Sequence, residues 1–154
     1  MNSISQTVEK KAPRIEDEST RVEGSIADVI GNLASRAAAT VDPAAIIVVT
    51  RSGFSTRMVS KHRPRTRIIA VAKSPKVSRR TRLYWGVEPL NVIWTEDRDE
   101  LLIRAVTRSL EKGFVEESDV VMIVSGSSLE APGRTSTLEI LKVEDILYHA
   151  FRRD

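Results

Sequence analysis

Residues 46–60 read IIVVTRSGFSTRMVS, and this stretch decides how the rest of the chain is organised. Its first four residues form an unbroken β-branched run, which is typical of a parallel strand buried on both faces. The polar residues that follow end the strand. Ser55 can cap a following helix whose inner face holds Met58 and Val59. The stretch therefore predicts a strand, a short polar loop and a helix, in that order.

A loop between a strand and a helix can bind an anion, because free backbone N–H groups at the helix start point at the ligand and the helix dipole favours negative charge. Gly53 permits a close backbone approach or a positive φ angle. The predicted phosphate-binding residues are Thr50, Arg51, Ser52, Gly53, Ser55 and Thr56. The loop matches neither G-x-x-x-x-G-K-[ST] nor G-x-G-x-x-G, so an ordinary helix-capping turn is the competing interpretation.

The composition excludes several classes of site. The 154 residues include no cysteine, so disulfides, thiolate catalysis and cysteine-based metal sites are excluded, and a cytoplasmic setting is favoured. Two histidines are too few for a histidine-rich metal site. No apolar run approaches the roughly 18 residues that cross a membrane, so we expect no membrane partner.

Positive charge is concentrated in one part of the sequence. Eleven lysines and arginines lie between Thr50 and Trp85, and no acidic residue interrupts them. This distribution favours an anionic partner. A non-specific nucleic-acid binder is one reading of such a run, but we rank it low because the basic residues are scattered, aromatic residues are sparse and no nucleic-acid motif is present.

Hydrophobic periodicity assigns the remaining elements. Residues 1–22 are polar without an apolar period and are expected to form a flexible N-terminal tail, so that the domain comprises residues 23–154. Helices are predicted over residues 25–40, 55–62, 75–85, 95–113 and 143–152, and strands over residues 45–49, 67–71, 87–94, 120–124 and 137–142. The alternation indicates an α/β fold whose parallel sheet is covered on both faces. The last strand follows the fourth without a helix and should pair antiparallel at the edge.

Four segments together resemble one known family. They are AAIIVVTRSGFSTRMVSKHRPRTRIIAV (residues 44–71), WGVEPL (85–90), GFVEESDVVMIVSG (113–126) and PGRTSTLEI (132–140). In order and spacing, from about Gly24 to Lys142, they are similar to the C-terminal domain of pyruvate kinase. The resemblance implies a three-layer α/β/α domain with a mixed five-stranded sheet in the order 3-2-1-4-5, strand 5 being antiparallel.

The same resemblance carries expectations about function. In pyruvate kinase, catalysis belongs to a preceding barrel. Only a short polar tail precedes the first predicted helix here, so we expect no catalytic residue, metal site or cofactor. The family's C-terminal domain binds sugar phosphates on the loop that matches residues 50–55, and it contributes to a tetramer interface. The chain is thus expected to be a phosphate-ester-binding regulatory domain that forms a homo-oligomer; a subunit docking onto a separately encoded barrel is the alternative.

Departures from the family pattern bear on the ligand. Relatives that bind a bisphosphate have a tryptophan followed seven residues later by an arginine; here Trp94 is followed by Leu101, which favours a monophosphate. Gly133 and Arg134, in the loop before the last strand, are possible additional ligand contacts, whereas Glu130 in that loop would oppose an anion. Trp94 also has a simpler interpretation, as a packing residue at a strand end.

An acidic cluster and an edge strand complete the candidates. The cluster resembles a metal or acid–base site, but acidic side chains at a helix start also complement the helix dipole, which is the preferred interpretation. Its members are Glu96, Asp97, Asp99 and Glu100. The strand over residues 137–142 would be an exposed edge unless paired, which supports the expected homo-oligomer.

Overall fold

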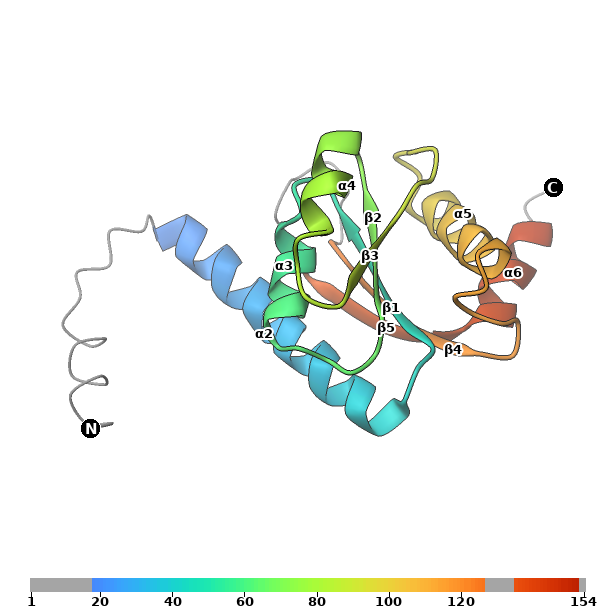
Figure 1. Ribbon diagram of the computed structural model, residues 1–154, viewed down its shortest axis with the longest axis horizontal. Helices are drawn as coiled ribbons and strands as arrows, with labels where there is room; N and C mark the ends of the chain where they lie inside the picture. The colour runs from blue at the N-terminus through green and yellow to red at the C-terminus, as the bar shows by residue number, and fades with distance from the viewer. Residues whose placement is uncertain (1–17, 127–134, 153–154) are drawn as a thin grey trace.

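The structure, a computed structural model, describes residues 18–126 and 135–152. They form three layers, a sheet between two layers of helices (Figure 1). In chain order the elements are α2 (Glu18–Val41), β1 (Ala45–Thr50), α3 (Phe54–Lys61), β2 (Ile68–Ala72), α4 (Pro75–Thr81), β3 (Val87–Leu90), α5 (Arg98–Glu111), β4 (Val120–Ser125), β5 (Thr137–Lys142) and α6 (Val143–Phe151).

The sheet has the strand order β3-β2-β1-β4-β5. Strand β1 lies at its centre and pairs parallel with β2 and β4, in registers that place Ile46 beside both Ile68 and Met122. Strand β5 pairs antiparallel with β4. The order and the antiparallel edge expected from the sequence are therefore confirmed, and all six residues of β5 lie within the predicted range.

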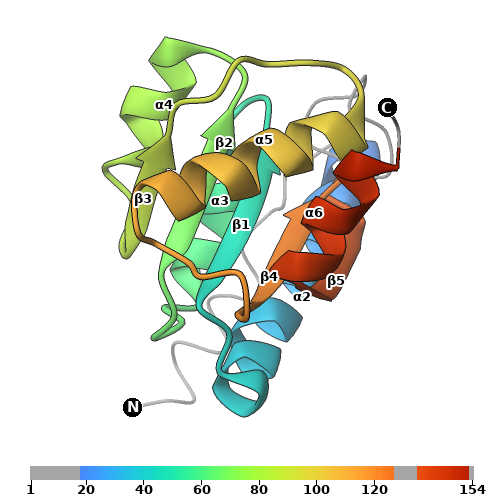
Figure 2. The same cartoon turned by 90° about the vertical axis from the view of Figure 1, so that its right-hand side faces the viewer.

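Alternating side chains of β1 build a separate core on each face of the sheet. Ile46 and Val48 pack with residues of α2 and α3, whereas Ile47 and Val49 pack with residues of α5 and α6. Figure 1 shows the two helix layers on opposite sides of the sheet, with α4 on the same side as α3, and Figure 2 looks onto α5 and α6. Burial on both faces explains why the strand reads as a continuous apolar run.

Helix α2 is longer than predicted. It begins at Glu18, so the expected cap Ser25 lies inside the helix, as do residues 18–22, which the sequence assigned to a tail. The residues of these first turns do not continue the helical spacing of apolar residues, so hydrophobic periodicity does not reveal that they are helical. Farther along, Gly31 lets α2 approach α3 closely, because a Cβ atom at this position would lie 2.5 Å from the carbonyl oxygen of Met58.

The bounds of α4, β3 and α5 also differ from prediction, and α5 runs from Arg98 to Glu111. Ser74 caps α4 as expected, accepting a hydrogen bond from the Val77 N–H. The helix ends at Thr81, however, because the next residues form tighter i to i−3 turns, such as the Tyr84 N–H bond to the Thr81 carbonyl. Strand β3 ends at Leu90 and includes Pro89, which an edge strand tolerates because one row of its backbone groups has no ladder partner.

Candidate functional site

The predicted loop lies at the point of the sheet where α/β folds most often bind ligands. Parallel strands β1, β2 and β4 end at the same edge, and from central β1 the chain turns to β2 on one side, while β4 lies on the other. Such a switch point leaves a crevice outside the carboxyl ends of the strands. Thr50 and Ser125, the last residues of β1 and β4, are both buried there.

Gly53 sets the geometry of the loop. Its backbone is left-handed, with φ 90° and ψ −6°, and it is the N-terminal cap residue of α3. A glycine adopts this conformation without the steric penalty that a side chain brings. The prediction that Ser55 caps the helix is wrong, because α3 already begins at Phe54. Ser55 is instead buried in the first turn, and its hydroxyl is hydrogen-bonded to that of Thr135.

The loop satisfies some of its own donors and leaves others open. The Gly53 N–H donates to the Thr50 hydroxyl over 2.8 Å, and the Phe54 N–H donates to the Ser52 hydroxyl over 3.3 Å. Within the described residues, no acceptor is found for the N–H groups of Ser55 and Thr56. Two N–H groups at the start of a helix are thus available to an anion.

A buried hydroxyl beside these groups also lacks a partner. Thr56 is 0% exposed, and its Oγ1 makes no hydrogen bond to any part of the chain that the structure describes. A buried polar atom without a partner costs about 1–3 kcal/mol, so one is retained rarely. The hydroxyl of Thr56, a predicted ligand residue, is therefore a hydrogen-bond donor without an acceptor in the described residues, in the first turn of α3.

Two strand ends and the segment after β3 bring charged and aromatic side chains to this edge. Arg51 forms an ion pair with Glu96, and Lys73, just after β2, lies 2.9 Å from the same carboxylate. Trp94 donates its indole N–H to Glu96 over 3.2 Å, and its ring lies 5.8 Å from the Arg51 guanidinium carbon. The structure thus brings Trp94 and Arg51 together at this edge.

Electrostatics keep this carboxylate ionised. A hydrogen bond from Lys73 lowers the pKa of Glu96, and the indole hydrogen bond and the nearby Arg51 charge act in the same direction. Lys73 was not among the predicted site residues, although its position directly after a strand that is parallel to β1 was a usable signal. Arg80 was also missed: it donates to the Ser52 carbonyl over 2.7 Å from α4, a contact that no local pattern reveals.

The other candidates have separate outcomes. Gly133 and Arg134, with Glu130, lie outside the described residues. Leu101 is fully buried in the apolar core and cannot reach a ligand.

The acidic cluster marks a helix start. Asp97 caps α5 by accepting a hydrogen bond from the Glu100 N–H over 3.0 Å, and Glu100 pairs with Arg104 one turn later. Within residues 18–126 and 135–152, no three histidine, aspartate or glutamate side chains gather as they would around a metal ion. Asp97, Asp99 and Glu100 thus lie at the start of α5, where acidic side chains complement the helix dipole, whereas Glu96 precedes the helix and pairs with Arg51 and Lys73.

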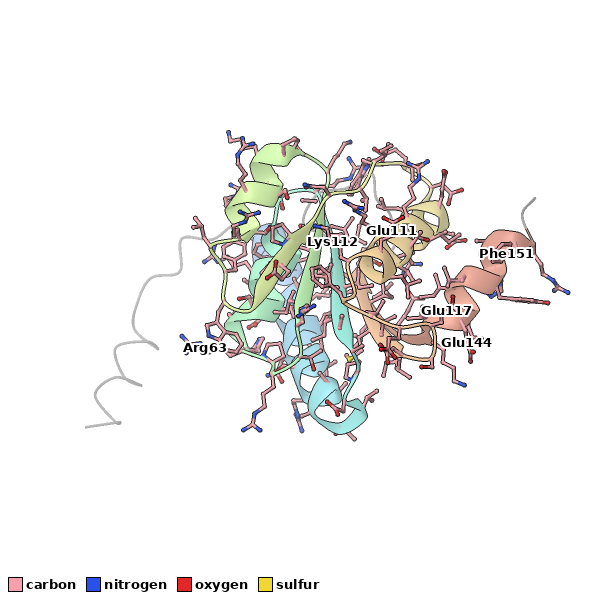
Figure 3. All side chains as sticks on the ribbon, turned by 45° about the vertical axis from the view of Figure 1, so that its right-hand side comes forward. Arg63, Glu111, Lys112, Glu117, Glu144 and Phe151 are labelled. Atoms are coloured by element: carbon pink, nitrogen blue, oxygen red, sulfur yellow. The ribbon has the colours of Figure 1, made fainter. Side chains whose placement is uncertain are left out.

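A second basic region lies at the opposite end of the sheet. A hollow of ≈ 600 Å³ lies beside the loop that leads into β2 and is lined by residues that include Arg63, Arg65 and Arg67. Arg63, labelled in Figure 3, lies at the outer surface, and its guanidinium carbon is 5.8 Å from the ring of Trp85. Arg67 lies over Phe114 at 4.4 Å.

No helix in the described part of the chain combines the length and apolar character needed to cross a membrane.

Strand order, two-sided helix cover and a glycine-centred loop after β1 together define a class of three-layer α/β/α domain with a short polar loop at its switch point. Comparison with known families makes the assignment specific. The model of the pyruvate kinase alpha/beta domain matches residues 28–141, and the chain belongs to this family.

Whole pyruvate kinases show the same relationship. The chain is 38% identical over 117 residues to pyruvate kinase of Clostridium acetobutylicum, a match that covers 76% of this chain and 25% of that enzyme. Its identity to the pyruvate kinases of Bacillus licheniformis and Geobacillus stearothermophilus is 36% over 129 and 122 residues, which cover 22% and 21% of those enzymes. The chain thus spans a quarter or less of the length of these relatives.

Proposed function

We propose that this chain is a regulatory domain that binds a phosphate ester at the loop after β1 and has no catalytic activity of its own. The observation that carries the proposal is a set of donors at the start of α3 that have no acceptor within the described residues: two backbone N–H groups, of Ser55 and Thr56, and the buried Thr56 hydroxyl. Phosphate oxygens accept several such hydrogen bonds at once, and the helix dipole adds to their stabilisation.

Charge around the loop supports an anion of this kind. Arg51 and Lys73 carry two positive charges against the single carboxylate of Glu96. The buried Nε of Arg51 has no hydrogen-bond partner within the described residues. The edge is therefore positively charged before a ligand arrives, and it retains hydrogen-bond donors that a phosphate can use.

A ligand panel tests the proposal directly. The purified chain would be titrated by calorimetry and thermal shift with glycerol 3-phosphate, fructose 6-phosphate and inorganic phosphate, and with glycerol and fructose as uncharged controls. Binding at 100 times Kd should stabilise the fold by about 2.7 kcal/mol. Arg51→Ala should weaken binding, whereas Arg65→Ala, which removes the same charge at the far end of the sheet, should not.

Two outcomes would contradict this function. Equal loss of binding in both arginine variants would show attraction to net charge and not a site at the loop. Formation of ATP from phosphoenolpyruvate and ADP, if it persisted through further purification of the chain, would contradict the absence of catalysis.

We also propose that the chain forms a homodimer or larger homo-oligomer through α2 and β5. Ile26, Val29 and Leu33 of α2 are 46%, 53% and 46% exposed at helical spacing. They share the α2 face of the sheet with Ile140, which is 47% exposed on the edge strand β5, whose outer side has no partner strand in the described residues. An apolar helix stripe beside an open strand edge is a surface that a second copy can cover in a two-fold arrangement.

Light scattering at high micromolar concentration measures the association. Val29→Glu together with Leu33→Glu should yield a monomer, because burying the two introduced charges is unfavourable, while Arg36→Glu on the same helix serves as the charge control. A strictly monomeric parent chain would contradict the proposal and would leave the patch to a different partner, such as a separately encoded barrel.

A further inference from the structure

The carboxylate of Glu96 occupies a cradle formed by three segments. Its Oε2 faces the Arg51 guanidinium, and its Oε1 accepts hydrogen bonds from Lys73 and from the Trp94 indole. These three donors follow β1, β2 and β3, which are neighbours in the sheet. Arg51 and Lys73 thus come directly from strand ends, whereas Trp94 lies on the same segment between β3 and α5 as Glu96.

The Glu96 side chain is more exposed and less constrained than that of Arg51. The Glu96 side chain is 52% exposed, and the residue lies between β3 and α5, before the Asp97 cap, where it belongs to no helix or strand. Rotation of this side chain toward solvent would break no backbone hydrogen bond of the helix or the sheet. Arg51, by contrast, is held between the loop and the Trp94 ring, with its side chain 17% exposed.

We propose that the cradle is a second anion subsite beside the phosphate loop, and that Glu96 is an internal carboxylate which the ligand's own carboxylate displaces. The inference rests on the proposed function, since the phosphate is bound by the adjoining loop. It specifies the ligand as a phosphate ester that also bears a carboxylate group. The cradle already holds a carboxylate with both oxygens engaged, and two cations against one acid leave it a net positive charge.

The position seven residues after Trp94 departs from the pattern of bisphosphate-binding relatives. The arginine that follows the tryptophan in bisphosphate-binding relatives is replaced by the buried Leu101. Lys73 supplies a cation to the same tryptophan from a different strand, with its ammonium 6.0 Å from the Trp94 ring. Selectivity for the second anionic group would therefore reside in Lys73 and Glu96.

A matched pair of probes tests the subsite. Glycerol 3-phosphate and 3-phosphoglycerate share a three-carbon phosphate ester, and only the second carries a carboxylate. Glu96→Gln removes the competing charge and keeps the side-chain shape, so it should tighten 3-phosphoglycerate binding by about tenfold and change glycerol 3-phosphate binding much less. Lys73→Met should abolish the preference for 3-phosphoglycerate. Glu88→Gln, the same substitution on the exposed face of β3, controls for net charge.

The outcomes separate the two proposals. If both probes bind, and Glu96→Gln tightens both equally or neither, the subsite is wrong while the phosphate loop stands. If neither probe nor any other phosphate ester binds the parent chain or the Glu96→Gln variant, the proposed function and the subsite both fail. A selective gain for 3-phosphoglycerate that Glu88→Gln does not reproduce would support the displacement of Glu96.

Discussion

The two basic ends of the sheet differ in what surrounds their positive charges. At the amino ends of the strands, Arg63, Arg65 and Arg67 are exposed beside a hollow, and no carboxylate pairs with them in the described part of the chain. At the carboxyl ends, Arg51 and Lys73 pair with a carboxylate and lie next to the turn at Gly53, whose following N–H groups have no acceptor among residues 18–126 and 135–152. Charge density alone therefore does not distinguish the ends; ordered hydrogen-bond donors do.

The largest expected effect tests the glycine-shaped turn. Gly53→Val introduces a β-branched side chain at φ 90° and within 3.5 Å of Val77, so we expect loss of phosphate-ester binding and a destabilisation of about 1–3 kcal/mol. Binding by calorimetry and stability by urea unfolding measure the two effects, with circular dichroism to establish that the variant is folded.

Asp42 provides the control at the other end. It also has a positive φ, of 50°, so Asp42→Gly should relieve strain and leave ligand binding unchanged. A folded Gly53→Val variant that binds phosphate esters like the parent would remove the distinction between the two ends.

A smaller effect is expected at the Thr56 hydroxyl, whose removal should stabilise the free protein. Thr56→Val replaces Oγ1, which has no partner in the described part of the chain, with a methyl group of similar size. The free protein should become more stable by about 1 kcal/mol while phosphate-ester binding weakens about tenfold. The control is Thr81→Val on α4, where the hydroxyl donates to the Ser78 carbonyl over 2.7 Å and its loss should destabilise. Destabilisation by both substitutions would show that Thr56 has a partner within the chain.

The smallest expected effect concerns the pairs that Asp28 forms with Lys61 and His62 at the end of α3, away from the phosphate loop. Hydrogen bonds from Lys61 and then from His62 lower the pKa of Asp28. Because the folded-state pKa is depressed, the ionised aspartate stabilises the fold above its ordinary pKa, and this contribution is lost as pH falls through the lowered value.

Asp28→Asn should therefore destabilise the protein at pH 7, by less than about 1 kcal/mol because the aspartate side chain is 42% exposed. The difference from the parent chain should vanish in strong acid. Urea unfolding at pH 7 and pH 2.5, with and without added salt, measures it. A difference that persists undiminished in acid would mean that the ion pairs are not its cause.

The sequence predicted the parts of the fold that local patterns encode. The β-branched run located β1 and the Ser-Pro pair located the start of α4, whereas the strand order came from the resemblance to the pyruvate kinase C-terminal domain. The cap of α3 was missed because the left-handed turn at Gly53 and a capping serine two residues later are equally compatible with the sequence. The pairing of Glu96 with Arg51 spans 45 residues and depends on where two strands end, which no local pattern encodes.

The hydrogen bond between Ser55 and Thr135 joins residues 80 positions apart. Its second partner lies just before β5, so the first turn of α3 acquires this contact only after β4 and β5 have reached the sheet. Strands β1, β2 and β3 can pair from nearby sequence, whereas the pairing of β1 with β4 closes a much longer loop and is expected to come later in folding. Ligand binding during refolding would then report the arrival of the C-terminal strands, after most of the helical signal has been regained.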